Sequence, residues 1–210
     1  DLMAVAGAAG FDEFHLVGHD WGSAVGWAAT MVLPTKVLTY NALSIPHVAA
    51  FGEAMADENS EQRQKSSYMA FFASPWLPER VFAFDDFDML KNNLYADHSE
   101  ATVAEYVAMF AEPGALTGAL NWYRASALPV VGGDSDEGGS APDLNPNITL
   151  PVQFIWGNQD QAVSAQSVEL QRKYLKGVYR EVELEAGHWL MEEEPEVVVN
   201  RVVDFIRANS

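Results

Sequence analysis

The stretch HLVGHDWGSAVGW, residues 15–27, has the outline of a strand, a tight turn and a helix. Asp20 stands at the centre of the turn, between Gly18 and Gly22. We expect a strained backbone at Asp20, and a strand and helix that approach too closely for side chains at the two glycines. The helix N-terminus behind Asp20 favours a negative charge. On its own, the pattern G-x-D-x-G fits equally well an aspartate that only caps the helix.

Four short apolar runs are typical of buried strands. They are FHLVG (14–18), VLTYNAL (37–43), VQFIWG (152–157) and YREVELE (179–185). The first three are almost continuously hydrophobic, as expected for parallel strands that are covered on both faces. Helical patterns follow the first and third runs and close the chain. Strands that alternate with helices predict a parallel sheet and therefore an α/β fold.

A long insertion, roughly residues 46–147, separates the second and third strands. It is rich in helix formers and lacks strand alternation, with helical segments at 61–73, 84–96, 99–112 and 114–128. Its last part, Gly132–Asn147, is full of Gly, Ser, Asp and Pro and predicts an exposed loop. We predict three parts: the first visible part of a sheet domain, a helical lid and the C-terminal part of the sheet domain, at 1–45, 46–147 and 148–210.

The composition is that of a globular protein. The chain has 210 residues, of which 49% are hydrophobic and 20% charged. A formal net charge of −18 argues against nucleic acid or an anionic membrane as a partner, because both would repel it. The absence of cysteine removes thiolate metal sites and cysteine nucleophiles. No apolar run approaches a membrane span and no signal peptide opens the chain, so we predict a cytoplasmic protein.

Two further residues follow predicted strands. Asp160 lies in FIWGNQDQAV, just beyond the third strand, and His188 lies in EAGHWLMEEEPE, just past the fourth. The carboxyl ends of parallel strands meet at one edge of a sheet, where sites of open α/β folds assemble. Taken alone, Asp160 fits a turn residue or a helix cap at least as well. The remaining histidines fit a catalytic role less well: His15, His19, His47 and His98.

The order Asp20, Asp160, His188 is the order nucleophile, acid, histidine of α/β-hydrolases. GHDWG, WGNQD and GHW resemble the nucleophile turn, acid turn and histidine loop of that family, and within it of the epoxide hydrolases. In the insertion, YMAFF and NWYRA resemble the two segments that carry this family's paired tyrosines, which implies Tyr68 and Tyr123. The resemblance spans nearly the whole chain. Without it, both tyrosines would be interpreted as packing within the lid.

The resemblance implies a specific use for an aspartate at the turn. A carboxylate is ionised near neutral pH and can attack a saturated carbon to form an ester. His188, oriented by Asp160, would then activate the water that cleaves this ester. The backbone N–H of Trp21 would stabilise the oxyanion that forms on Asp20. We expect the aromatic neighbours of the tyrosines to line an apolar substrate pocket, among them Phe71 and Trp122.

The leaving group separates two related chemistries. An epoxide oxygen leaves as an alkoxide and needs a proton, which the phenols of Tyr68 and Tyr123 can donate. A halide needs no proton, and Trp21 also resembles the halide-binding tryptophan of haloalkane dehalogenases. We therefore favour an epoxide hydrolase that acts on a small hydrophobic epoxide and water, and keep a haloalkane dehalogenase and a non-catalytic ligand receptor as alternatives. No metal or organic cofactor is implied, since the acidic stretches are not spaced as ligands.

The first residues suggest a chain that starts within a fold. DLMAVAGAAGF opens at Asp1 and indicates the tail of a helix that ends near Gly10. In the resembling family a second oxyanion donor comes from a His-Gly-x-Pro segment after an earlier strand. This sequence lacks that segment, so we expect it to contain only the second half of the hydrolase sheet.

Overall fold

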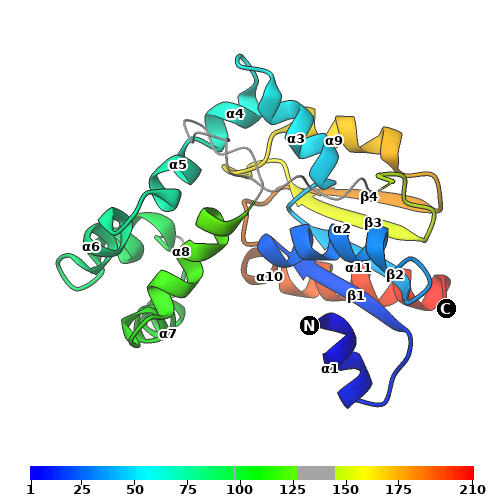
Figure 1. Ribbon diagram of the computed structural model, residues 1–210, viewed down its shortest axis with the longest axis horizontal. Helices are drawn as coiled ribbons and strands as arrows, with labels where there is room; N and C mark the ends of the chain where they lie inside the picture. The colour runs from blue at the N-terminus through cyan, green and yellow to red at the C-terminus, as the bar shows by residue number, and fades with distance from the viewer. Residues whose placement is uncertain (97, 127–144) are drawn as a thin grey trace. The chain divides into compact units, whose positions relative to one another are not determined.

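The computed structural model describes residues 1–96, 98–126 and 145–210. The chain divides into two compact units, shown in Figure 1. The core unit contains Asp1–Lys65 and Ser140–Ser210, and the helical unit contains Ser66–Gly139. Most of the predicted loop Gly132–Asn147 lies outside the described residues.

A parallel sheet forms the centre of the core unit. Among the described residues it has four strands, which lie side by side in chain order: β1 (Phe14–His19), β2 (Val37–Leu43), β3 (Val152–Gly157) and β4 (Tyr179–Leu184). The strands agree with the predicted runs to within about one residue at each end. The prediction of an α/β fold with a parallel sheet is confirmed.

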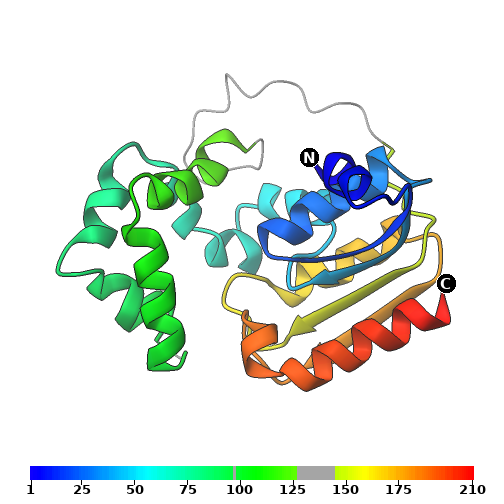
Figure 2. The same ribbon diagram turned by 90° about the horizontal axis from the view of Figure 1, so that it is seen from below.

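Helices cover both faces of this sheet. The core unit contains α1 (Leu2–Ala8), α2 (Trp21–Val32), α3 (Val48–Ala56), α4 (Glu61–Lys65), α9 (Ala165–Gln171), a 3₁₀ turn η3 (Arg172–Tyr174), α10 (Leu190–Glu193) and α11 (Pro195–Ala208). Figure 2 shows α2 and α11 on opposite faces of the sheet. Two of these helices start as their sequences indicate: the side chain of Ser164 caps α9, and Pro195 is the first residue of α11.

The described residues bury one hydrophobic cluster on each face of the sheet. The larger cluster includes Trp27 of α2 together with Tyr40 and Phe154, and the smaller one includes Ile155 and Leu190. Phe154 and Ile155 are neighbours in β3 but belong to different clusters, because successive side chains of a strand point to opposite faces. This alternation explains why β3 is apolar along its length, since both of its faces are buried.

Strand β1 is less buried than β2 and β3. All residues of β3 are buried, whereas Val17 of β1 is 45% exposed. In the part of the chain that the structure describes, β1 pairs with β2 alone and forms an edge of the sheet. Within the described residues, Val17 of the first strand is therefore less covered than the sequence pattern predicts. The expectation of cover on both faces holds for β3, which lies between two other strands.

The helices α3 and α4 fall within the predicted insertion but pack with the core unit. Helix α3 lies against α9, and α4 contacts both of them. The boundary between the two compact units therefore falls after Lys65. The division of the chain into sheet and lid parts at residues 46 and 147 stays a prediction.

The helical unit consists of short helices packed on one another. They are α5 (Tyr68–Ala73), α6 (Leu77–Ala83), a π-helical turn η1 (Leu90–Leu94), α7 (Glu100–Ala111) and α8 (Ala115–Ala125). Helix α8 contacts α5, α6 and α7, and its Leu120 is buried with Met69 and Phe82. That this unit acts as a lid stays a prediction. Over residues 1–96, 98–126 and 145–210, no helix has the length and apolar character needed to cross a membrane.

Candidate active site

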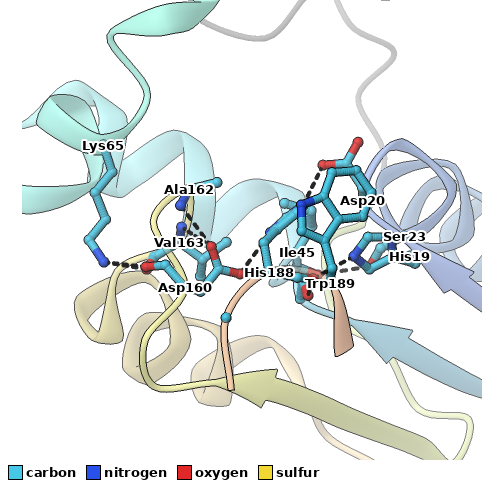
Figure 3. Close-up of polar contacts among 12 residues, drawn as sticks. His19, Asp20, Ser23, Ile45, Lys65, Asp160, Ala162, Val163, His188 and Trp189 are labelled. Atoms are coloured by element: carbon cyan, nitrogen blue, oxygen red, sulfur yellow. Dashed lines mark hydrogen bonds and ion pairs between the residues drawn. The ribbon is translucent and has the colours of Figure 1, made fainter. Parts of the chain in front are cut away.

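Polar residues follow each of the four strands at the carboxyl edge of the sheet. Asp20 comes directly after β1 and Ser44 directly after β2, while Asp160 and His188 lie in the turns after β3 and β4. Figure 3 shows that Asp160 and His188 point toward one another, with Asp20 on the other side of the histidine. The sheet therefore brings together the three residues that the sequence predicts as nucleophile, acid and histidine.

The turn that carries Asp20 is strained and tightly packed. Asp20 has φ 51° and ψ −121°, a positive φ that is uncommon for any residue except glycine. A Cβ added to Gly18 would lie 2.3 Å from the carbonyl oxygen of Gly22, so strand and helix are too close for a side chain there. At Gly22 itself an added Cβ would meet no described atom within 4 Å. The predicted crowding is confirmed at Gly18 and wrong at Gly22, whose missing side chain would face open space.

The backbone at the start of α2 supplies a hydrogen-bond donor to Asp20. The N–H of Trp21 donates to Asp20 Oδ2 at 2.7 Å. Trp21 is the first residue of α2, where backbone N–H groups point out of the end of the helix. An aspartate that only caps a helix usually accepts from the second or third helical residue. The contact with Trp21 thus favours a carboxylate that does more than cap the helix. That the N–H of Trp21 is the oxyanion donor stays a prediction.

His188 bridges two carboxylates. Its Nδ1 lies 2.8 Å from Asp160 Oδ2, and its Nε2 lies 3.0 Å from Asp20 Oδ1. An ionised carboxylate can only accept hydrogen bonds, so a protonated His188 can donate from each ring nitrogen, one to each carboxylate. Asp160 is 1% exposed, whereas the side chain of Asp20 is 31% exposed. The buried carboxylate orients the ring and the more accessible one can meet a substrate.

The charges of the three groups depend on one another. Burial lowers the pKa of His188, but hydrogen bonds and charges from Asp160 and Asp20 outweigh burial and raise this pKa to about 10. Burial raises the pKa of Asp20, but the hydrogen bond and charge of His188 outweigh it, and the pKa of Asp20 lies below its ordinary value. At neutral pH the site therefore holds a protonated His188 beside an ionised Asp20.

The two predicted tyrosines lie together within the helical unit. Tyr68 is the first residue of α5 and Tyr123 lies in the last turn of α8. Their ring centroids are 6.2 Å apart, and both rings pack edge-on against Phe72 at 5.1 and 5.0 Å. Phe71 contacts Phe72 and Phe82 instead, and Trp122 is 51% exposed. The structure thus pairs the tyrosines, while the substrate contacts expected of Phe71 and Trp122 stay predictions.

The alpha/beta hydrolase family model matches residues 1–201. The chain belongs to the alpha/beta hydrolase family. Among curated relatives, Epoxide hydrolase 4 of Homo sapiens is 29% identical over 221 residues, which cover 99% of this chain and 57% of the relative. The AB hydrolase superfamily protein YfhM of Bacillus subtilis is 28% identical over 197 residues, covering 91% of this chain and 65% of the relative. The chain therefore spans a little over half the length of its human relative.

A solved structure supports the same assignment. The crystal structure of a Bacillus megaterium epoxide hydrolase in complex with an inhibitor has a TM-score of 0.82 and 25% sequence identity to this chain. The match covers 99% of this chain and 74% of that one. The predicted resemblance to the α/β-hydrolase family, and to epoxide hydrolases within it, is confirmed.

The acid turn of this α/β-hydrolase is held by main-chain contacts that sequence reasoning missed. Asp160 Oδ1 accepts from the N–H groups of Ala162 and Val163 at 2.7 and 3.1 Å. The ammonium of Lys65 donates to the carbonyl oxygens of Asp160 and Val163 at 2.6 and 3.0 Å, and Gln62 donates to the carbonyl of Ala162 at 2.7 Å. Figure 3 shows Lys65 extending from α4 to this turn. No motif marks Gln62 or Lys65, because the atoms of the acid turn that they hold are backbone atoms about 100 residues away in the sequence.

The tyrosine pair of this family member is braced by an ion pair, which the sequence motif NWYRA does not reveal. Arg124 follows Tyr123 in α8, and its two terminal nitrogens lie 2.7 and 2.8 Å from the carboxylate oxygens of Glu79 in α6. Arg124 also donates to the carbonyl oxygen of Ser74, at the end of α5. The hydrogen bond from Arg124 lowers the pKa of Glu79 to about 2. The helices that carry the tyrosines are thus tied together beside the aromatic rings.

Metal chemistry has no obvious ligand set in the described ranges. No group of three or more histidine, aspartate or glutamate side chains there could hold a metal ion.

Proposed function

We propose that the protein is an epoxide hydrolase, which converts an epoxide and water to a vicinal diol. The observation that carries this proposal is the hydrogen-bonded series Asp20–His188–Asp160, with a carboxylate at the strained turn where acyl hydrolases carry serine. The paired Tyr68 and Tyr123 in the helical unit support it, because an epoxide needs proton donors. The names of the human and Bacillus megaterium relatives point the same way.

In the first step, a carboxylate oxygen of Asp20 attacks a carbon of the epoxide ring. A bond forms between this oxygen and the carbon, and the carbon–oxygen bond of the ring breaks. The oxygen that leaves carries the electron pair and takes a proton from Tyr68 or Tyr123. The product is a hydroxyalkyl ester of Asp20. The oxygen of the opened ring stays in the same molecule as its hydroxyl group, so no fragment is released. Because Asp20 is held ionised by His188, no base is needed for this step.

Formation of the ester changes the acidity of His188. The ester carries no negative charge, so the charge of Asp20 that raises the pKa of His188 disappears. The pKa of His188 then falls toward the value set by burial and Asp160. The ring therefore loses a proton, and this proton replaces the one that Tyr68 or Tyr123 gave to the leaving oxygen. His188 becomes a base only after the ester exists. The order of the two steps is thus built into the charges of the site.

In the second step, neutral His188 takes a proton from water, and the resulting hydroxide attacks the carbonyl carbon of the ester. The oxyanion that forms accepts from the N–H of Trp21, which already donates to the Asp20 carboxylate at 2.7 Å. When the intermediate collapses, the diol leaves as an alkoxide and takes the proton from His188. Asp20 is left as a carboxylic acid and passes its proton to neutral His188, 3.0 Å away, which restores the carboxylate and the protonated imidazole of the starting state. In sum, one epoxide and one water give one diol.

The ester can be trapped by removing the base. With styrene oxide as the probe, the His188→Gln variant of the intact protein is expected to gain the mass of the whole epoxide on the peptide that contains Asp20. Asp20→Ala in the same background is the control and should gain no mass. Diol formation by the wild-type protein without any adduct in His188→Gln would contradict the ester mechanism.

The second candidate is a haloalkane dehalogenase, and the position of Trp21 beside Asp20 is the observation that favours it. A halide needs no proton, so the paired phenols would be dispensable. The discriminating experiment measures diol and halide side by side in wild type and in the double variant Tyr68→Phe, Tyr123→Phe. Halide release that survives the double change, with no diol from styrene oxide, would replace the first proposal.

A further inference from the structure

We propose that His19 is a positioning residue: together with Ser44 it holds the main-chain carbonyl of His188 and so fixes the imidazole for ester hydrolysis. The inference rests on the proposed function, because it assigns His19 to the second of the two steps. His19 lies beside the nucleophile in the sequence, but its side chain is directed at the histidine loop.

Two side chains donate to the same carbonyl oxygen. His19 Nε2 lies 2.8 Å from the carbonyl oxygen of His188, and Ser44 Oγ donates to this oxygen at 3.0 Å. A carbonyl oxygen has two lone pairs, so these two donors use its full capacity. The carbonyl belongs to the residue that must act as base, and any movement of it moves the ring. We call this pair of contacts the carbonyl clamp.

Both donors of the carbonyl clamp are themselves fixed at strand ends. His19 is the last residue of β1, and its ring lies 4.9 Å from the ring of His188 and 5.7 Å from that of Trp189. Ser44 follows β2, is fully buried and has φ 65°. Its backbone N–H donates to the carbonyl oxygen of Ile155 in β3 at 2.9 Å. The clamp thus ties the histidine loop to the first three strands.

The rest of the histidine loop is held from its other side. Glu193 in α10 accepts from the N–H groups of Gly187 and Trp189 at 2.6 and 3.2 Å. The loop also presses on the end of β3, since a Cβ added to Gly157 would lie 2.1 Å from the carbonyl oxygen of Ala186. These contacts hold the flanks of the loop. The carbonyl clamp acts at His188 itself.

The protonation of His19 is compatible with donation. Its Nε2 must carry a proton, because a carbonyl oxygen can only accept. Burial and the nearby charge of His188 lower the pKa of His19, which keeps its ring neutral with one proton to donate. A neutral donor adds no positive charge beside the protonated His188. The clamp can therefore hold the loop without opposing the charge that His188 needs.

The two steps of the reaction depend on the clamp to different degrees. Attack by Asp20 requires only its own carboxylate and a proton donor. Hydrolysis of the ester requires His188 to stay aligned with Asp160, 2.8 Å away, while it takes a proton from water. A displacement of about 1 Å in a catalytic group can cost about 100-fold in rate. Loss of the clamp should slow hydrolysis and leave ester formation nearly unchanged.

Two variants of His19 separate donation from packing. His19→Phe keeps an aromatic ring against His188 and Trp189 but cannot donate, whereas His19→Gln can donate from its amide nitrogen but has no ring. In single-turnover experiments with styrene oxide, we expect His19→Phe to slow ester hydrolysis by about 10- to 100-fold and to accumulate the Asp20 adduct, with ester formation within about 3-fold of wild type. His19→Gln should hydrolyse the ester within about 5-fold of wild type.

Ser44→Ala removes the other donor and is expected to slow the same step by a smaller factor. If both donors hold one carbonyl, combining Ser44→Ala with His19→Phe should give a change that differs from the product of the single changes. Full hydrolysis by His19→Phe with loss in His19→Gln would show that the ring only packs. Equal slowing of both steps, with a lower melting temperature, would show a purely structural role. Either result overturns the proposal.

A measurement without substrate keeps the clamp distinct from the proposed function. If the wild-type protein forms no adduct and no diol from epoxides, the proposed function fails and the clamp is judged by proton NMR alone. The Nδ1 proton of His188, bound to Asp160, should give a downfield resonance in wild type and in His19→Gln, and this resonance should shift or disappear in His19→Phe. An unchanged resonance in His19→Phe would overturn the clamp.

Discussion

In the core unit, the proposed nucleophile, acid and base follow β1, β3 and β4 of one sheet, and hydrogen bonds with main-chain atoms hold each of their turns. In the helical unit, Tyr68 and Tyr123 come from α5 and α8, which are joined by the ring of Phe72 and by the hydrogen bond from Arg124 to the carbonyl oxygen of Ser74. Strand register brings the turns of the first set to one edge of the sheet. The tyrosines depend on side-chain packing, which tolerates replacement more easily.

Because of this difference, the two units serve different steps of the proposed reaction. The steps that need strict geometry, attack by Asp20 and proton transfer by His188, use the sheet edge. Protonation of the leaving oxygen uses two phenols, either of which can donate. Changes in the core unit should therefore abolish a step, and changes in the helical unit should reduce a rate.

The largest effect is expected from Asp20→Ala. Without the carboxylate no ester can form, so diol formation should fall by at least about 10⁴-fold. Asp204→Ala, an exposed aspartate in α11, is the matched control and should keep full activity. Substantial turnover by Asp20→Ala would show that another group attacks the epoxide.

The next effect is expected from the double variant Tyr68→Phe, Tyr123→Phe. It should lower the rate of ester formation by about 10²- to 10⁴-fold, the usual contribution of a general acid. Each single variant should lose much less, since the other phenol remains. Tyr106→Phe, which alters a different tyrosine pair of the helical unit, is the control. Equal losses in the single and double variants would contradict the idea that the two phenols share one task.

The pH dependence of stability tests the charge of His188. The pKa of its folded form is about 10, above the ordinary value of 6.5. A raised histidine pKa stabilises the fold fully below about pH 6.5, and this stabilisation is lost as pH rises toward 10. The free energy of unfolding should therefore fall over that window in wild type, and more weakly in His188→Gln. Parallel curves for the two proteins, from chemical denaturation at several pH values, would show that His188 is not held protonated.

The smallest effect is expected from Arg124→Met, which breaks the ion pair with Glu79. Bidentate pairs at partly exposed sites contribute on the order of 1 kcal/mol, so a modest fall in stability is expected. The rate of ester formation should fall by less than about 10-fold, because Phe72 still packs between the tyrosines. Arg124→Lys keeps the charge but loses the planar fork. Its stability and its rate of ester formation should lie between those of the wild type and those of Arg124→Met. A loss as large as that of the double tyrosine variant would mean that the ion pair, not packing, places the phenols.

The sequence predicted the strands and the three core residues because each has a local signal. Asp20 stands in a strand–turn–helix pattern, and Asp160 and His188 follow apolar runs in the expected order. The contacts of Lys65 and Ser44 could not be predicted in this way, because they bind backbone atoms that only the fold brings near. Gly22 shows the opposite error, since the motif suggested crowding that its surroundings do not contain.

The most direct test of the ester mechanism follows the oxygen of water through one turnover. With excess wild-type protein and a single turnover of styrene oxide in ¹⁸O-labelled water, hydroxide attacks the carbonyl carbon of the Asp20 ester. The account predicts an unlabelled diol and ¹⁸O in the carboxylate of Asp20, measured by peptide mass spectrometry. Label in the diol after this first turnover, with none in Asp20, would show that water attacks the epoxide directly and would contradict the account.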